Sequence, residues 1–152
     1  MLLRKDKFTE CKISIVGYQF PHLGGDIDDG NWLNVLIEAK HPTGNWKKID
    51  ACLETFELKS LISWLEKIAK VQEVEKHLYF TEPCLEFEII GNTVIRVYFD
   101  YEVAPTWRNK DEKVFMDFEM NEKDFERVIK ELNTDLEKFS IRANVKNARH
   151  KI

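Results

Sequence analysis

The 152-residue chain has little of what usually marks secretion, a disulfide scaffold or serine chemistry. Its three cysteines are widely spaced and form no C-x-x-C pair, a pattern that indicates neither a disulfide framework nor a zinc site. Its four serines include none in a G-x-S-x-G turn. No apolar run approaches the roughly 18 residues of a membrane helix, and the N-terminus lacks the apolar segment of a secretion signal. These absences favour a protein of the reducing cytoplasm.

Positive charge is scarce in most of the chain. The whole sequence has 23 basic and 27 acidic residues, a net charge of −4. Five basic and no acidic residues follow from Lys138 onward, so residues 1–137 carry 18 basic and 27 acidic groups, a net charge of −9. An acidic body repels nucleic acid phosphates and attracts basic partners. We expect one domain over residues 1–139 and a basic tail over residues 140–152, which is either a solvated extension or a contact for RNA or an acidic partner.

The apolar pattern predicts a single α+β domain. Period-2 alternation predicts strands, and apolar residues at three- and four-residue steps predict amphipathic helices. The strands are expected at 8–18, 32–40, 46–52, 79–81, 85–89, 94–101 and 114–120, and the helices at 55–69 and 121–139. The expected order is β-β-β-α-β-β-β-β-α, a mainly antiparallel sheet with the helices on one face.

Local signals predict how these elements begin and turn. Thr55 is expected to cap the first helix, and Asn121 the second, with Asp124 three residues on. Gly91-Asn92 predicts a hairpin turn.

Two patterns could support catalysis. Cys52 or Cys84 could be a nucleophile with His77 as its base, although each cysteine lies in an apolar stretch where a free thiol packs as a small hydrophobe. Glu86 and Glu88 share one strand face and could act as an acid–base pair, but outward-facing strand glutamates need no such role. We therefore expect no catalytic residue.

The loop over residues 19–30 holds one polar cluster, of His22, Asp26, Asp28 and Asp29. Its spacing is not that of an EF-hand, whose twelfth position would be Ile37 here instead of a glutamate. A solvated acidic loop is the expected structure, with no metal and no cofactor.

Three tryptophans, Trp32, Trp46 and Trp107, lie at strand starts or in loops. Tryptophan beside acidic groups is typical of a protein interface, and tryptophan at a strand end also covers the open end of a small core. Both interpretations stay open for these residues.

Short motifs of the chain, over about residues 13–107, resemble the WapI family of immunity proteins. They are Gly17-Tyr18-Gln19-Phe20-Pro21, Asn31-Trp32-Leu33, Gly44-Asn45-Trp46, Cys52-Leu53-x-Thr55-x-Glu57-Leu58-x-x-Leu61-x-x-Trp64-Leu65 and Phe80-x-Glu82-Pro83-x-Leu85-x-Phe87. The resemblance implies a small, non-enzymatic cytoplasmic inhibitor that neutralises the C-terminal domain of a secreted toxin. In the founding case that domain cleaves transfer RNA.

The expected partner is therefore a cognate toxin domain of basic charge, with no direct contact to nucleic acid or membrane and an oligomeric state left open. Charge and exposure favour a partner surface of Asp26, Asp28, Asp29, Trp32 and Trp107. The alternatives are an interaction or ligand-binding module with another partner, and a hydrolase that uses His77 or the strand glutamates.

Overall fold

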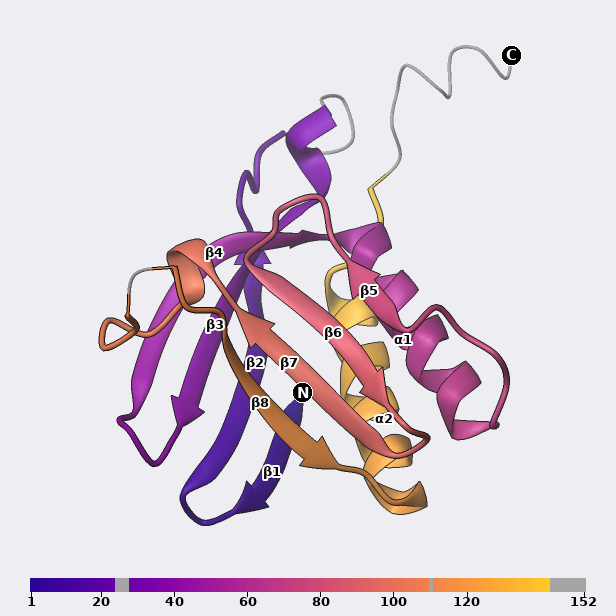
Figure 1. Ribbon diagram of the computed structural model, residues 1–152. Helices are drawn as coiled ribbons and strands as arrows, with labels where there is room; N and C mark the ends of the chain where they lie inside the picture. Colours follow the sequence, from indigo (N-terminus) through magenta and orange to yellow (C-terminus); the bar gives the residue numbers. More distant parts are fainter. Residues whose placement is uncertain (24–27, 110, 143–152) are drawn as a thin grey trace.

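The computed structural model describes residues 1–23, 28–109 and 111–142 (Figure 1). Within these residues, eight strands form two four-stranded antiparallel sheets. Sheet A contains β1 (Leu2–Asp6), β2 (Thr9–Tyr18), β3 (Trp32–Lys40) and β4 (Trp46–Glu54). Sheet B contains β5 (His77–Tyr79), β6 (Leu85–Ile90), β7 (Val94–Phe99) and β8 (Val114–Glu119).

Two helices and two 3-10 turns complete the chain: α1 (Thr55–Ala69), α2 (Glu122–Lys138), η1 (Asp28–Asn31) and η2 (Tyr101–Val103). The two helices lie side by side (Figure 1). The α+β class and the order of the predicted strands and helices are confirmed, with one further strand, β1, ahead of them. None of the helices in the described part of the chain has the length and apolar character needed to span a membrane.

Sheet A follows the predicted alternation. Leu33, Val35, Ile37 and Ala39 of β3 are buried, while the residues between them are only half-buried. The register of β3 with β4 shifts between the pairs Leu33–Leu53 and Val35–Asp50, which places an extra residue in β4. Such a bulge re-aims the side chains that follow it.

Strand β1 lies ahead of the first predicted strand. It pairs with β2 at the edge of sheet A, and only Leu3 of its residues is fully buried. The charged residues that follow Leu3 are exposed, as is common for edge strands. Two adjacent leucines followed by charged residues do not alternate, so they give no pattern that predicts a strand.

The starts of the helices differ in how well they were predicted. Asn121 caps α2 as expected, since its Oδ1 accepts from the Asp124 N–H at 2.8 Å. The prediction for Thr55 was wrong, because the cap of α1 is Glu54 and the Thr55 hydroxyl instead donates to Oδ1 of Asn31 at 3.0 Å. The helix begins at Thr55 itself, one residue earlier than a Thr55 cap would require.

Buried side chains of both sheets and both helices form one hydrophobic cluster. Its largest fully buried members come from sheet A, α1 and sheet B alike, and include Leu33, Leu58, Phe87, Phe99 and Phe118. The two sheets are therefore held by a shared core. Edge strand β4 also contacts η2, which follows sheet B strand β7, and this junction frames the site described next.

Candidate functional site

A cleft of about 690 Å³ opens where β4 meets the turns of sheet B. Its walls come from four places: the two ends of the loop after β2, the start of β3, the middle of β4, and the turns that precede β6 and follow β7. The lining residues in the described part of the chain are Gln19, Phe20, Asp29, Trp32, Asp50, Ala51, Glu82, Pro83, Cys84, Tyr101 and Glu102. Four of these are acidic, and none is basic.

The acidic groups are placed to act together on a ligand. Asp29, Glu82 and Glu102 are exposed, and Asp50 is half-buried. Burial, followed by the charges of Glu57 and Asp29, raises the pKa of the neighbouring Glu54 carboxyl. A cation entering the cleft would relieve this repulsion.

Aromatic side chains complete the cleft. Tyr101 and Phe20 are 61% and 39% exposed, and Trp32 is half-buried. Exposed aromatic rings next to charged groups are typical of the residues that dominate binding energy in protein interfaces. The cleft thus combines carboxylates, most of them exposed, with exposed aromatic rings.

Buried polar contacts hold the backbone of two cleft walls. Oδ1 of Asn31, the residue before Trp32, accepts the Thr55 hydroxyl. The buried Glu57 accepts from the N–H of Glu54 at 3.0 Å and from the N–H of Thr81, the residue before Glu82, at 2.7 Å. Both contacts run from the start of α1, so this helix end fixes the positions of Trp32 and Glu82.

A third wall is held by backbone hydrogen bonds. The Asp100 N–H donates to the carbonyl of Cys84 at 2.9 Å, and the Asp100 carboxylate accepts from the N–H of Tyr101 at 2.8 Å. Arg108 pairs with the same carboxylate. The η2 turn, which carries Tyr101 and Glu102, is thereby fixed next to Cys84.

Of the five predicted partner residues, the structure brings two together in the cleft. Asp29 and Trp32 both line the cleft. Asp26 lies outside the described residues, and Asp28 is described only as the first residue of η1. Trp107 lies away from the cleft lining, where its indole N–H donates to the carbonyl of Gly44 at 3.0 Å.

The other cleft acids, Asp50, Glu82 and Glu102, did not stand out in the sequence. They come from three segments that only the packing of the two sheets brings together. The sole sequence signal near them was the Glu82-Pro83 pair in one of the family-like motifs.

Residues 1–140 match the family model described as the Immunity protein WapI-like family. The chain belongs to the WapI-like immunity protein family. This confirms the resemblance carried by the sequence motifs, and it indicates an immunity protein that acts against a toxin and binds it. Neither the search of curated proteins nor the search of solved structures found a match.

Two motif residues of this WapI-like protein, Thr55 and Glu57, are the ones that hold the cleft walls through Asn31 and Thr81. Both are buried, with exposed fractions of 0% and 6%. In this protein the helix-entry motif therefore positions the cleft as well as starting α1.

The strand glutamates form a separate polar network on the outer face of sheet B. Glu86 accepts from Lys113 at 2.6 Å and pairs with Nδ1 of His77 at 2.8 Å, while Glu88 accepts the Tyr98 hydroxyl at 2.7 Å. Both glutamates face outward as predicted, yet these neighbours cover them to 8% and 5% exposure. Burial disfavours the charged form of Glu88, but the Tyr98 hydrogen bond and nearby cations, led by His77, outweigh it and lower its pKa. The carboxylates are thus occupied by structural partners.

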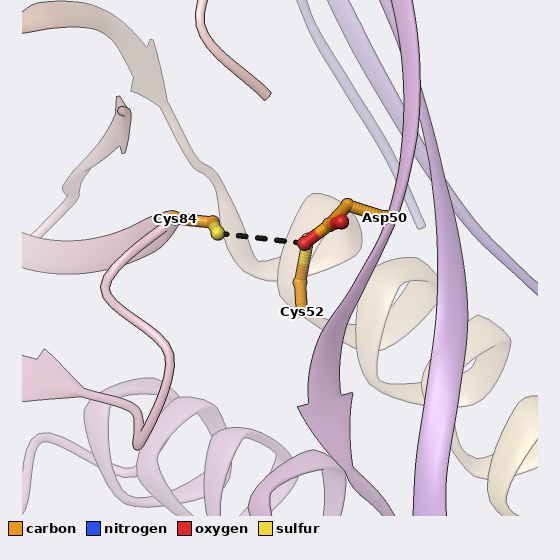
Figure 2. A group of neighbouring side chains, drawn as sticks. All are labelled: Asp50, Cys52 and Cys84. Atoms are coloured by element: carbon orange, nitrogen blue, oxygen red, sulfur yellow. Dashed lines mark hydrogen bonds between the residues drawn. The ribbon is translucent and has the colours of Figure 1, made fainter. Parts of the chain in front are cut away.

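One group of side chains at the cleft floor could hold a metal ion (Figure 2). Asp50 and Cys52 both come from β4, and Cys84 faces them from the turn before β6. The carboxylate oxygen and the two sulfur atoms lie within 4.8 Å of one another. The third cysteine, Cys11, is fully buried in β2, and this burial raises the pKa of its thiol.

Proposed function

We propose that the protein neutralises the C-terminal domain of a cognate secreted toxin by binding basic side chains of that domain in the acidic cleft. The observation that carries this proposal is the composition of the cleft, with four carboxylates, no basic lining residue among those described, and exposed aromatic rings. Arginine and lysine side chains suit such a site, because their stems pack on aromatic rings while their charged ends pair with carboxylates.

A nuclease toxin, such as one that cleaves transfer RNA, fits this chemistry. A nuclease needs a basic surface to bind phosphate, and an acidic inhibitor can cover that surface. The proposed action takes place in the cytoplasm and requires no catalysis by the inhibitor. The engagement of Glu86 and Glu88 with His77, Lys113 and Tyr98 supports a structural role for those carboxylates.

The test is co-expression with the toxin domain encoded next to this gene, scored by growth, followed by calorimetry at low and moderate salt. The cleft variant carries Asp29→Lys, Glu82→Lys and Glu102→Lys, all at exposed positions. The control carries Glu73→Lys, Glu126→Lys and Glu137→Lys, which are exposed, lie outside the cleft lining, and change the net charge equally.

We expect the cleft variant to bind the toxin at least about 100-fold more weakly than the control, mainly because it associates more slowly. Its affinity should also depend less on salt than that of the control. Growth protection should be lost in the cleft variant and kept in the control. Equal affinity of the two triple variants would place the docking surface elsewhere. Rescue without any complex would contradict inhibition by binding.

A further inference from the structure

We propose that Asp50, Cys52 and Cys84 form a binding site for one zinc ion at the floor of the cleft. The inference stands apart from toxin neutralisation, because metal uptake is measured on the inhibitor alone. It rests on the geometry of the three donor atoms, on the charge around them and on the path by which an ion reaches them.

The donor atoms are spaced as zinc requires. Oδ2 of Asp50 lies 3.6 Å from Sγ of Cys84 and 3.9 Å from Sγ of Cys52. In a tetrahedral zinc site, with Zn–S and Zn–O bonds of about 2.3 and 2.1 Å, a sulfur and an oxygen ligand are separated by about 3.6 Å. The observed spacings are thus close to two edges of such a tetrahedron, and the two sulfur atoms of the third edge lie within 4.8 Å of each other.

The donor types also select the metal. Two cysteine sulfurs and one carboxylate oxygen are a soft-rich set that favours zinc over magnesium or calcium, which prefer oxygen ligands only. Three protein ligands leave the fourth position free for water or for a further cleft ligand.

The negative charge around the site favours a bound cation. The hydrogen bonds that the structure gives the Asp50 side chain both come from thiols, which are weak donors. Glu82 and Glu102 share the cleft with this carboxylate, and the lining described above contains no lysine or arginine. All three cysteines belong to the buried cluster, but Cys11 lies outside this group of metal-ligating side chains and so provides the contrast.

The fold brings the ligand side chains together and gives the ion a route to them from solvent. Cys52 and Leu53, two consecutive residues at the bulge in β4, are both buried, and Sγ of Cys52 lies 3.9 Å from Oδ2 of Asp50. Cys84 also lines the cleft, which gives the ion a path from solvent. Zinc would thus join strand β4 of sheet A to the turn that leads into β6 of sheet B.

Binding conserves the charge of the site. Zinc displaces the protons of both thiols, which leave to solvent, and coordinates two thiolates and one carboxylate. One aspartate with two thiols carries a charge of about −1, and the same ligands with Zn²⁺, after loss of two protons, also carry about −1. No oxidant or reductant takes part.

The test uses the full chain, purified with a non-thiol reductant, stripped of metal, and titrated with Zn²⁺ and then Co²⁺. We expect one ion per chain, a sulfur-to-cobalt charge-transfer band in the near ultraviolet, and the visible bands of tetrahedral cobalt. Cys52→Ser and Cys84→Ser should each lose the charge-transfer intensity of one thiolate and bind at least about 10-fold more weakly. Cys11→Ser, the matched control, should keep the affinity and the spectrum.

A measurement on the unaltered chain covers the case in which a serine variant fails to fold. Stoichiometric zinc should raise the melting temperature of the wild-type and Cys11→Ser proteins, and it should slow alkylation of Cys84. The proposal is overturned if the reduced wild-type chain takes up no stoichiometric metal. It is equally overturned if the cobalt spectrum lacks the thiolate band, or if Cys84→Ser binds with unchanged spectrum and affinity.

Discussion

The indole N–H of Trp107 donates to the carbonyl of Gly44, 63 residues earlier in the chain, at 3.0 Å. The same indole ring lies 4.9 Å from the imidazole of His41 and 5.8 Å from the ring of Trp46, measured between centroids. Trp46 in turn packs edge-on against Phe99 of β7. Trp107 thus covers the end of the core where the turn between β3 and β4 meets the loop after η2.

Glycine at position 44 is required by this contact. A Cβ atom there would lie 3.1 Å from Cδ1 of Trp107, closer than most real contacts. We expect Gly44→Ala to lower the free energy of unfolding by about 1–3 kcal/mol, because the indole ring must move. The matched control is Gly17→Ala, where nothing lies within 4 Å of the added Cβ. Urea denaturation of both variants measures the difference, and equal stabilities would show that Trp107 yields without cost.

Glu57 is predicted to be a stability determinant. Replacing it with alanine leaves the N–H groups of Glu54 and Thr81 without their acceptor. We expect Glu57→Ala to cost about 2–4 kcal/mol of unfolding free energy, from two unsatisfied backbone donors and the lost helix start. Glu66→Ala, further along the same helix and less buried, should cost less than about 1 kcal/mol. A loss in Glu57→Ala no larger than in Glu66→Ala would mean that water replaces the carboxylate.

His41 gives the protein a pH dependence near neutrality. Burial lowers the pKa of His41 below its ordinary value of 6.5, and its Nδ1 accepts from the N–H of Thr43 at 3.0 Å. The unfolded chain therefore binds the proton more readily, so stability is complete above the unfolded pKa and falls as the pH decreases through it.

Substitution isolates this contribution. His41→Asn keeps a side-chain acceptor near the Thr43 N–H but does not titrate. Melting temperatures of the wild type and His41→Asn should converge in their pH slopes above pH 7 and diverge as the pH falls below about 6.5, where only the wild type loses the histidine contribution. Parallel slopes over that range would show that protonated His41 is accommodated in the folded state.

Glu88 gives a second pH dependence, at lower pH. Its pKa lies below the ordinary 4.5, and its carboxylate accepts the Tyr98 hydroxyl. Because the folded pKa is depressed, the contribution is present above the unfolded pKa and is lost as the pH falls through the folded pKa. Glu88→Gln should flatten the acid limb of the stability curve below about pH 4.5, whereas the exposed Glu126→Gln should leave it unchanged. An acid limb identical in wild type and Glu88→Gln would contradict this role.

Periodicity predicted the strands with a complete apolar face and missed the one without. Leu33, Val35 and Ile37 alternate along β3, and the strand has the predicted bounds. Strand β1 has one fully buried residue, Leu3, and charged neighbours, so its pairing with β2 depends on backbone hydrogen bonds that no side-chain pattern records. Glu86 and Glu88 faced the predicted direction, but their burial depends on Lys113, which precedes β8, and on Tyr98 of β7.

The candidate site was less accessible to sequence analysis than the fold. Asp29 and Trp32 were singled out because local charge and aromatic content were visible in one segment. Glu82 and Glu102 belong to other segments, and their meeting in one cleft depends on the packing of sheet A against the turns of sheet B. The same holds for Cys52 and Cys84, whose 32-residue separation hides a pair that shares one carboxylate.

The residues that support the cleft differ from those exposed in it, and this affects how the protein can change during evolution. Thr55, Glu57 and Asp100 make the hydrogen bonds that hold the cleft walls. The carboxylates on these walls, those of Asp29, Glu82 and Glu102, are exposed. If the cleft is the docking surface proposed above, substitutions at these three exposed positions alter recognition at little cost to folding. A lineage of such inhibitors can therefore follow changes in its toxin by substituting exposed residues while the folded core stays the same.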